Sequence, residues 1–122
     1  MNFHAWLPTT PFLLPETRFV QSSPDNTLTS PGAAYIPIVV AAYNYRNNVI
    51  YNNSSRGYTR VNLIKPDLTA PGVDMIVPSA DHTVTTDSGT SISAAFVTGI
   101  AALMLEWGIP RGNNPVMDTT SI

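Results

Sequence analysis

One stretch of the sequence decides the fold: Asp87-Ser88-Gly89-Thr90-Ser91-Ile92-Ser93-Ala94-Ala95, which continues into Phe96-Val97-Thr98-Gly99-Ile100-Ala101-Ala102-Leu103-Met104-Leu105. A Gly-Thr-Ser turn opens a segment that is apolar on nearly every face, which predicts a buried helix over residues 91–107 with Gly108 as its stop. The unpaired N–H groups and positive dipole end at a helix start can stabilise an oxyanion during acyl transfer. Ser91 is therefore a candidate nucleophile, and the alternative is a serine that only initiates the helix.

The composition is that of a globular chain, with 122 residues, 43% of them apolar and 11% charged. The formal net charge of −2 gives no indication of a nucleic-acid or anionic-membrane partner. Cysteine is absent, which excludes disulfides and thiolate chemistry. The longest apolar run, residues 92–105, falls short of the ~18 residues of a membrane span. It also contains Ser93, Thr98 and Gly99, so we predict a core helix and no membrane span.

The remainder of the chain favours short strands, because 11 prolines interrupt it and six of them fall within the first 37 residues. We expect a loop over residues 9–32 and a turn over residues 54–57. Apolar and β-branched runs predict strands over residues 3–7, 36–43, 49–51, 74–77 and 83–86, the last in a hairpin whose tip holds Asp81 and His82. A helix that is apolar all round needs cover that these few elements do not supply, which indicates an interior piece of a larger α/β fold.

Three motifs then follow one another in the sequence: Asn53-Ser54-Ser55-Arg56-Gly57, Lys65-Pro66-Asp67-Leu68-Thr69-Ala70-Pro71-Gly72-Val73, and Ser88-Gly89-Thr90-Ser91 with Ala94, Ala95, Val97 and Gly99. Together, over residues 36–105, they resemble the subtilisin-like serine peptidases (subtilases, S8-type). The resemblance implies the C-terminal part of a three-layer α/β fold, in which a parallel sheet carries a buried central helix after the nucleophile turn. The flanking residues 6–8, 14–19, 56–60 and 106–109 are similar to those of the germination-type subtilases of spore-forming bacteria.

The same resemblance assigns roles to individual residues. It implies that Ser91 is the nucleophile and that its own N–H is an oxyanion donor, with Gly89 and Thr90 as the supporting turn. Residues 70–72 would form the turn into a core strand. The implied activity is that of a serine endopeptidase acting on peptide or protein substrates outside the cytoplasm or in the spore, without a cofactor or a metal.

Serine chemistry also needs a base and an orienting carboxylate, and subtilases carry both well over a hundred residues before the serine. Only 90 residues precede Ser91, and no His-Gly-Thr-His segment occurs among them. His4 is expected to be a strand residue, His82 an exposed hairpin residue and Asp87 a turn former, rather than triad members. The Asn that usually donates to the oxyanion also has no matching position.

We therefore expect residues 9–122 to be the C-terminal portion of a catalytic domain and residues 1–8 to end an inserted upstream β-domain. The missing N-terminal part of the catalytic domain would be the partner that supplies the Asp and the His. The alternative is a non-catalytic remnant or pseudoprotease that binds a protein partner.

The other charged residues carry weaker signals. Arg56, Arg60 and Lys65 are expected at the surface, with anion contacts as the alternative. Asp67 is expected to form a turn or accept hydrogen bonds, because no second carboxylate lies near it in the sequence to complete a metal site.

Overall fold

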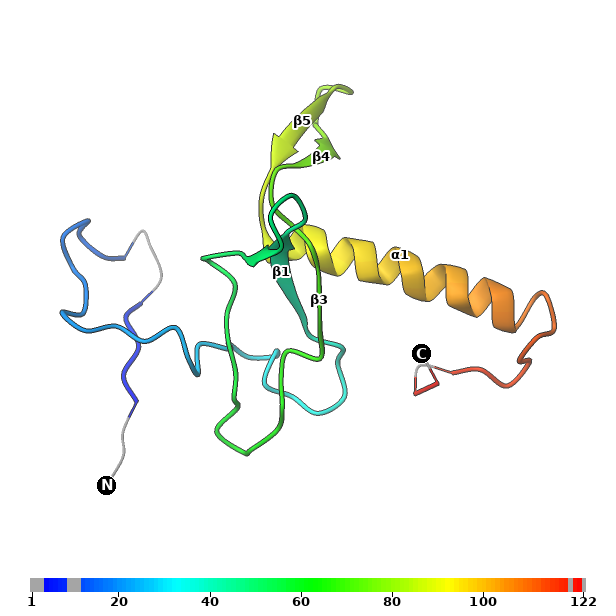
Figure 1. Cartoon of the computed structure of the whole chain (residues 1–122), viewed down its shortest axis with the longest axis horizontal. Helices are drawn as coiled ribbons and strands as arrows, with labels where there is room; N and C mark the ends of the chain where they lie inside the picture. Colours follow the sequence, from blue (N-terminus) through cyan, green and yellow to red (C-terminus); the bar gives the residue numbers. More distant parts are fainter. Residues whose placement is uncertain (1–3, 9–11, 119, 122) are drawn as a thin grey trace.

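The computed structural model describes residues 4–8, 12–118, 120 and 121. These residues form the strands β1 (Val40–Asn44), β2 (Val49–Ile50), β3 (Leu68–Pro71), β4 (Met75–Pro78) and β5 (Val84–Asp87), followed by the helix α1 (Thr90–Gly108). Strands β2, β1 and β3 form one sheet, in which β1 is antiparallel to β2 and parallel to β3. Strands β4 and β5 form a separate antiparallel hairpin. Figure 1 shows that α1 starts beside the sheet and extends away from it, which makes this a partial α/β fold as predicted.

Small residues form the buried apolar core of the described chain. Ala41 and Ala42 of β1 are 3% and 0% exposed, and Ala70 of β3 is 4% exposed. In the parallel register of β1 and β3, Ala42 lies beside Ala70. Because alanine side chains are short, the start of α1 can pack closely on these two strands. The sheet therefore contacts the helix through its smallest side chains.

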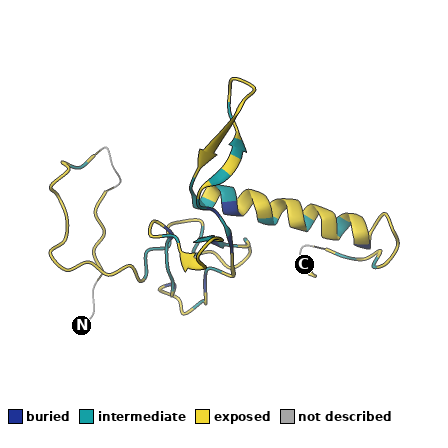
Figure 2. Cartoon of the chain, turned by 45° about the horizontal axis from the view of Figure 1, so that its top comes forward, coloured by how far each residue is buried: buried dark blue, intermediate teal, exposed yellow. Residues whose placement is uncertain are grey.

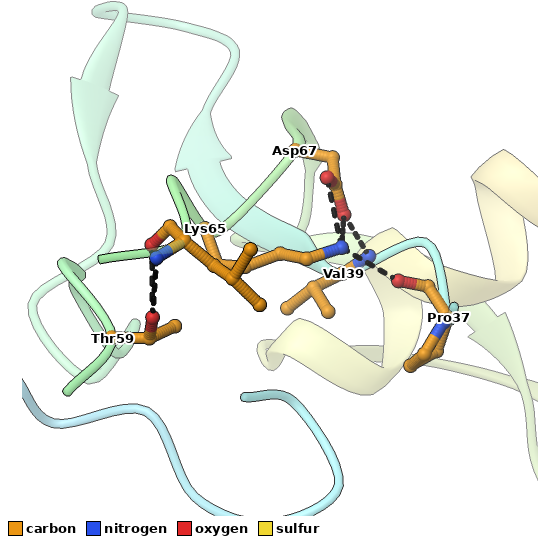
Figure 3. Close-up of polar contacts among 6 residues, drawn as sticks. Pro37, Val39, Thr59, Lys65 and Asp67 are labelled. Carbon is orange, nitrogen blue, oxygen red and sulfur yellow. Dashed lines mark hydrogen bonds and ion pairs between the residues drawn. The ribbon is translucent and has the colours of Figure 1, made fainter. Parts of the chain in front are cut away.

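The ion pair of Lys65 and Asp67, just before β3, is hydrogen-bonded to the segment that enters β1 (Figure 3). Lys65 Nζ donates to Asp67 Oδ2 at 2.7 Å and to the carbonyl oxygen of Pro37 at 2.9 Å. Asp67 Oδ2 also accepts the Val39 N–H at 2.7 Å. Lys65 is only 8% exposed, so the prediction that it is a surface residue is wrong. The prediction that Asp67 is a hydrogen-bonding residue is confirmed.

Most of the strands predicted from apolar and β-branched runs are present in the structure. Strand β2 and the hairpin of β4 and β5 lie close to their predicted positions, and residues 12–32 contain no helix or strand. The first sheet strand starts at Val40 rather than at residue 36, because Pro37 lacks an N–H and its carbonyl accepts from Lys65. The turn expected over residues 54–57 lies slightly earlier, where the Ser54 N–H donates to the Tyr51 carbonyl at 2.9 Å.

One strand prediction and one turn prediction are wrong. Residues 4–8 form no strand, and Phe3 lies outside the described residues; the Trp6 indole donates to the Asn26 carbonyl at 3.2 Å instead of joining a sheet. Residues 70 and 71, expected as a turn, are the last residues of β3. Pro66 just before this strand and Pro71 at its last position hide its pattern, and its parallel pairing with β1 forms it nonetheless.

Helix α1 forms where it is predicted and ends at Gly108, but it is not buried within this chain. Only Ser93 and Gly108 are buried among its 19 residues, and Figure 2 shows most of the helix as exposed. Ile92, Phe96, Ile100 and Leu103 line an apolar groove of about 610 Å³ together with Val77 of β4. The described residues contain too few other elements to cover the helix, which is the physical reason for the difference.

The length and the mean hydropathy of 1.4 of α1 also meet the requirement for a membrane-crossing helix. Core helices of water-soluble proteins meet the same requirement, so this property alone does not assign the helix to a membrane.

The exposed face of α1 predicts self-association of the isolated chain, because large exposed apolar patches associate in water. We expect a mass above the 13.2 kDa of the monomer in light scattering after gel filtration. The double variant Ile100→Lys, Leu103→Lys should shift the chain toward the monomer, since it places charges in the groove. The matched change on the hairpin, Ile76→Lys with Val84→Lys, should not. A parent chain that is monomeric and melts cooperatively would contradict the prediction.

The ion pair of Lys65 and Asp67 predicts a pH dependence of stability. Partial burial disfavours the ionised Asp67 carboxyl, but the hydrogen bonds from Lys65 Nζ and from the Val39 N–H outweigh it and lower the pKa of Asp67 below its ordinary value. The ionised carboxylate therefore stabilises the fold above the unfolded pKa of about 3.9. This stabilisation is lost as the pH falls through the lowered pKa of the folded chain. In urea unfolding between pH 2 and 6, Asp67→Asn should remove this acid-dependent part; an unchanged pH profile would exclude the role.

Candidate active site

Ser91 lies in the first turn of α1, and its side chain is exposed. The residue before the helix, Gly89, has extended backbone angles (φ 170°, ψ 157°), and no side chain caps the helix start. Among the described residues, no acceptor lies within hydrogen-bonding geometry of the Ser91 N–H. The Ser91 hydroxyl and its backbone N–H are therefore both free to meet a ligand at the positive end of the helix dipole.

The turn before Ser91 is tied to the segment that follows β3. The Gly89 N–H donates to the Gly72 carbonyl at 2.7 Å, and the Asp74 N–H donates to Ser88 Oγ at 2.8 Å. The Ser88 N–H in turn donates to Asp87 Oδ1 at 2.7 Å. These bonds hold the two chain segments side by side just before the helix begins.

The turn after Ser91 is anchored by Ser93, whose side chain is fully buried. Its Oγ lies 3.0 Å from the carbonyl oxygen of Ala70 and 3.1 Å from that of Pro71, and its single proton is shared between these two acceptors at the end of β3. Ser91 thus lies between two attachments to the same region, one on either side of it in the sequence.

Gly72 provides the space for this junction. A Cβ built on Gly72 would collide with Ser93 Oγ, would lie 2.8 Å from the Gly89 carbonyl oxygen and would lie 2.9 Å from the Ala42 Cβ. A side chain at this position would therefore push the start of α1 away from the sheet.

The structure brings neither histidine to Ser91. His82 lies in the connection between β4 and β5, at the free end of a hairpin that points away from α1 (Figure 1). His4 lies in the N-terminal segment, on the other side of the sheet from α1 (Figures 1 and 2). Asp87 is the last residue of β5, and its Oδ1 accepts a hydrogen bond from the Ser88 N–H, so it is a strand residue and not the turn former that the sequence predicts. The described residues also contain no group of three His, Cys, Asp or Glu side chains that could hold a metal ion.

The sequence does not predict the buried, hydrogen-bonded positions of two structurally important residues, Ser93 and Lys65. Ser93 carried a signal, since it is a polar residue within an apolar helix, but the polarity of one residue does not reveal its partner. Lys65 carried none, because its burial depends on Pro37, which lies 28 residues earlier in the chain.

With the fold and this geometry described, comparison with known proteins identifies the class of protein. The model of the Subtilase family matches residues 17–120, and the chain therefore belongs to the subtilase family. The family resemblance predicted from the three sequence motifs is confirmed.

Particular relatives are similar to parts of the chain. The solved structure of the Clostridium perfringens CspB protease matches 81% of this chain with a TM-score of 0.76 and 46% sequence identity. The serine protease AprX of Bacillus subtilis (strain 168) is 33% identical over 106 residues, or 70% of this chain. The subtilisin-like protease SBT4.13 of Arabidopsis thaliana is 40% identical over 75 residues, or 51% of this chain.

The chain spans only a small part of each of these relatives. The matched regions make up 22% of the CspB protease chain, 24% of AprX and 10% of SBT4.13. The similarity therefore concerns one segment of a much larger protease.

The close approach at Gly72 predicts opposite effects for two glycine substitutions. Gly72→Ala should destabilise the chain by about 1–3 kcal/mol, because its Cβ has no space. Gly99→Ala should be neutral or stabilise by up to about 1 kcal/mol, since nothing lies within 4 Å of its Cβ position and alanine favours a helix. Urea unfolding followed by circular dichroism measures both changes. Equal effects of the two substitutions would show that the junction at Gly72 is not tightly packed.

Proposed function

We propose that this chain is the nucleophile-bearing part of a subtilisin-like serine endopeptidase that cleaves peptide or protein substrates, with Ser91 as the nucleophile. One observation carries the proposal: the exposed hydroxyl and unpaired N–H of Ser91 lie together at the start of α1, in a turn held on both sides. Membership of the subtilase family and the names of the similar proteases support it.

The proposed chemistry is acyl transfer. Ser91 Oγ attacks the carbonyl carbon of the scissile peptide bond and loses its proton to a histidine base. The carbonyl oxygen becomes an oxyanion, which accepts a hydrogen bond from the Ser91 N–H. Collapse of the intermediate expels the amine, which takes the proton from the histidine, and water then hydrolyses the acyl-serine ester. This chain supplies the nucleophile and one oxyanion donor, and the rest of the catalytic domain supplies the base and its orienting carboxylate.

The rest of the catalytic domain is also the proposed cover for α1. The apolar groove along Phe96, Ile100 and Leu103 is open in this chain, which covers only about a quarter or less of each protease compared above. In this proposal α1 is a core helix of the complete domain and not a membrane span. Residues 9–122 then form the C-terminal portion of the catalytic domain, and residues 1–8 end a β-domain inserted before it. We further propose an extracytoplasmic location and, more narrowly, the germination-type group and the spore.

The isolated chain should show no peptidase activity, because loss of triad members lowers catalysis by several orders of magnitude even in an intact site. A fluorophosphonate probe, which reacts with activated serines, should therefore not label Ser91 in the isolated 122-residue chain. Labelling at a rate typical of active peptidases would contradict the dependence on a missing part.

A hybrid protease tests the function itself. The full chain replaces the segment that it matches in the Clostridium perfringens CspB protease, so that the remainder of that protease supplies the other parts of the domain. We expect the hybrid to cleave peptides and to be labelled by the fluorophosphonate, and Ser91→Ala to abolish both. Ser121→Ala is the matched control, since it removes an exposed serine hydroxyl that donates to Asp118. A folded hybrid without labelling would favour the non-catalytic alternative, a pseudoprotease that binds a protein partner.

A further inference from the structure

We infer that Ser93 is a positioning residue for Ser91, and that its buried hydroxyl sets where the nucleophile and its N–H lie relative to the sheet. The inference rests on the proposed function, because it assigns a role in the reaction only if Ser91 is the nucleophile. Ser93 is not a catalytic residue in this scheme, since it is fully buried behind the helix start and would not touch the substrate.

The geometry separates Ser93 from an ordinary helical serine. Serine and threonine hydroxyls inside helices commonly bond to the carbonyl four residues earlier. Thr98 on the same helix does this, and its Oγ1 donates to the Ala94 carbonyl at 2.9 Å. The Ser93 hydroxyl instead leaves the helix and reaches the Ala70 and Pro71 carbonyls of β3. Its bond therefore joins two elements, whereas the bond of Thr98 stays within one.

Because Ser93 is close to Ser91 in the helix, its bond to β3 also restrains the position of Ser91. Ser93 follows Ser91 by two residues in the same helical turn, and the Gly89–Gly72 bond holds the chain two residues before it. Together the two attachments restrain the first turn of α1 against sliding along β3 and against rotating about it. Without the Ser93 hydroxyl, the bonds of Gly89 and Ser88 to the segment after β3 and the packing on small side chains remain. Among the described residues, no other side chain of the first turn of α1 donates to the sheet.

Correct placement matters strongly for a nucleophile. A displacement of about 1 Å in a reacting group can lower a rate about 100-fold, because attack needs a narrow range of distance and direction. Loss of the Ser93 hydroxyl should therefore act on the chemical step and leave substrate binding nearly unchanged, since the substrate does not contact Ser93.

The test uses Ser93→Ala in the full chain within the hybrid protease. We count active sites by the stoichiometry of fluorophosphonate labelling and measure kcat per labelled site together with KM. We expect kcat per site to fall about 10- to 100-fold with KM nearly unchanged. Ser93→Cys, which keeps a weak donor of similar size, should lie between Ser93→Ala and the parent. Thr98→Ala is the matched control and should leave kcat per site unchanged.

The outcomes distinguish this inference from the proposed function. If Ser91→Ala abolishes activity but Ser93→Ala leaves kcat per site unchanged, the positioning role is overturned and the function stands. A smaller number of active sites, each working at the parental rate, would show a purely structural role and would also overturn it. If labelling and cleavage persist in Ser91→Ala, the proposed function is overturned and this inference with it. If Ser93→Ala does not fold, the kcat per site of Ser93→Cys decides: an unchanged value overturns the inference and a reduced one supports it.

Discussion

The arrangement of this chain depends on one junction, at which the end of β3 meets the start of α1. Ser93 Oγ donates there to strand carbonyls, the Gly89 N–H donates to the Gly72 carbonyl, and the missing side chain of Gly72 leaves room for both. The junction is polar and close-packed at once. Because buried polar groups are costly when unpaired, each hydrogen bond there restrains geometry more strongly than a surface bond would. The exposed Ser91 derives its defined position from this buried neighbourhood.

The chain combines a well-defined junction with very little apolar burial. Among the described residues, the buried apolar core consists of three alanines, whereas large side chains such as Phe96, Leu103 and Trp107 of α1 are 44%, 66% and 52% exposed. Burial of apolar surface is the main favourable term in folding, so a helix of this composition stabilises a structure only when something covers it. The local geometry of the Ser91 turn and the overall stability of the domain therefore have different sources. Hydrogen bonds within this chain fix the geometry of the Ser91 turn. In our proposal, the remainder of the catalytic domain covers the helix and thereby stabilises the domain.

Sequence patterns predicted the elements whose signals are local. The apolar run after Ser91 predicted α1, and an apolar run and a β-branched run on either side of Asp81 and His82 predicted the strands β4 and β5. The sequence did not predict strand β3, because Pro66 precedes it, Pro71 ends it, and its pairing partner in β1 lies 28 positions away in the register. The buried position of Lys65 was also not predicted. Lysine is rarely buried without a partner, and the carbonyl of Pro37 that accepts its hydrogen bond is distant in the sequence. The prediction that α1 is buried holds only for Ser93 at the junction and Gly108 at the helix end. The pattern of apolar residues shows which face a helix can bury, but not whether another element is present to cover it.

The sequence by itself determined the family, the position of the Gly-Thr-Ser turn and the existence of an apolar helix behind it, because each depends on residues adjacent in the chain. It also showed that a histidine base and an orienting acid in their family motifs are absent from these 122 residues. Only the tertiary structure decided which groups hold the Ser91 turn in place, because that depends on β3 and α1 meeting at Gly72 and Ser93. Hydrogen-bond partners more than 20 residues apart are chosen by packing and not by local preference.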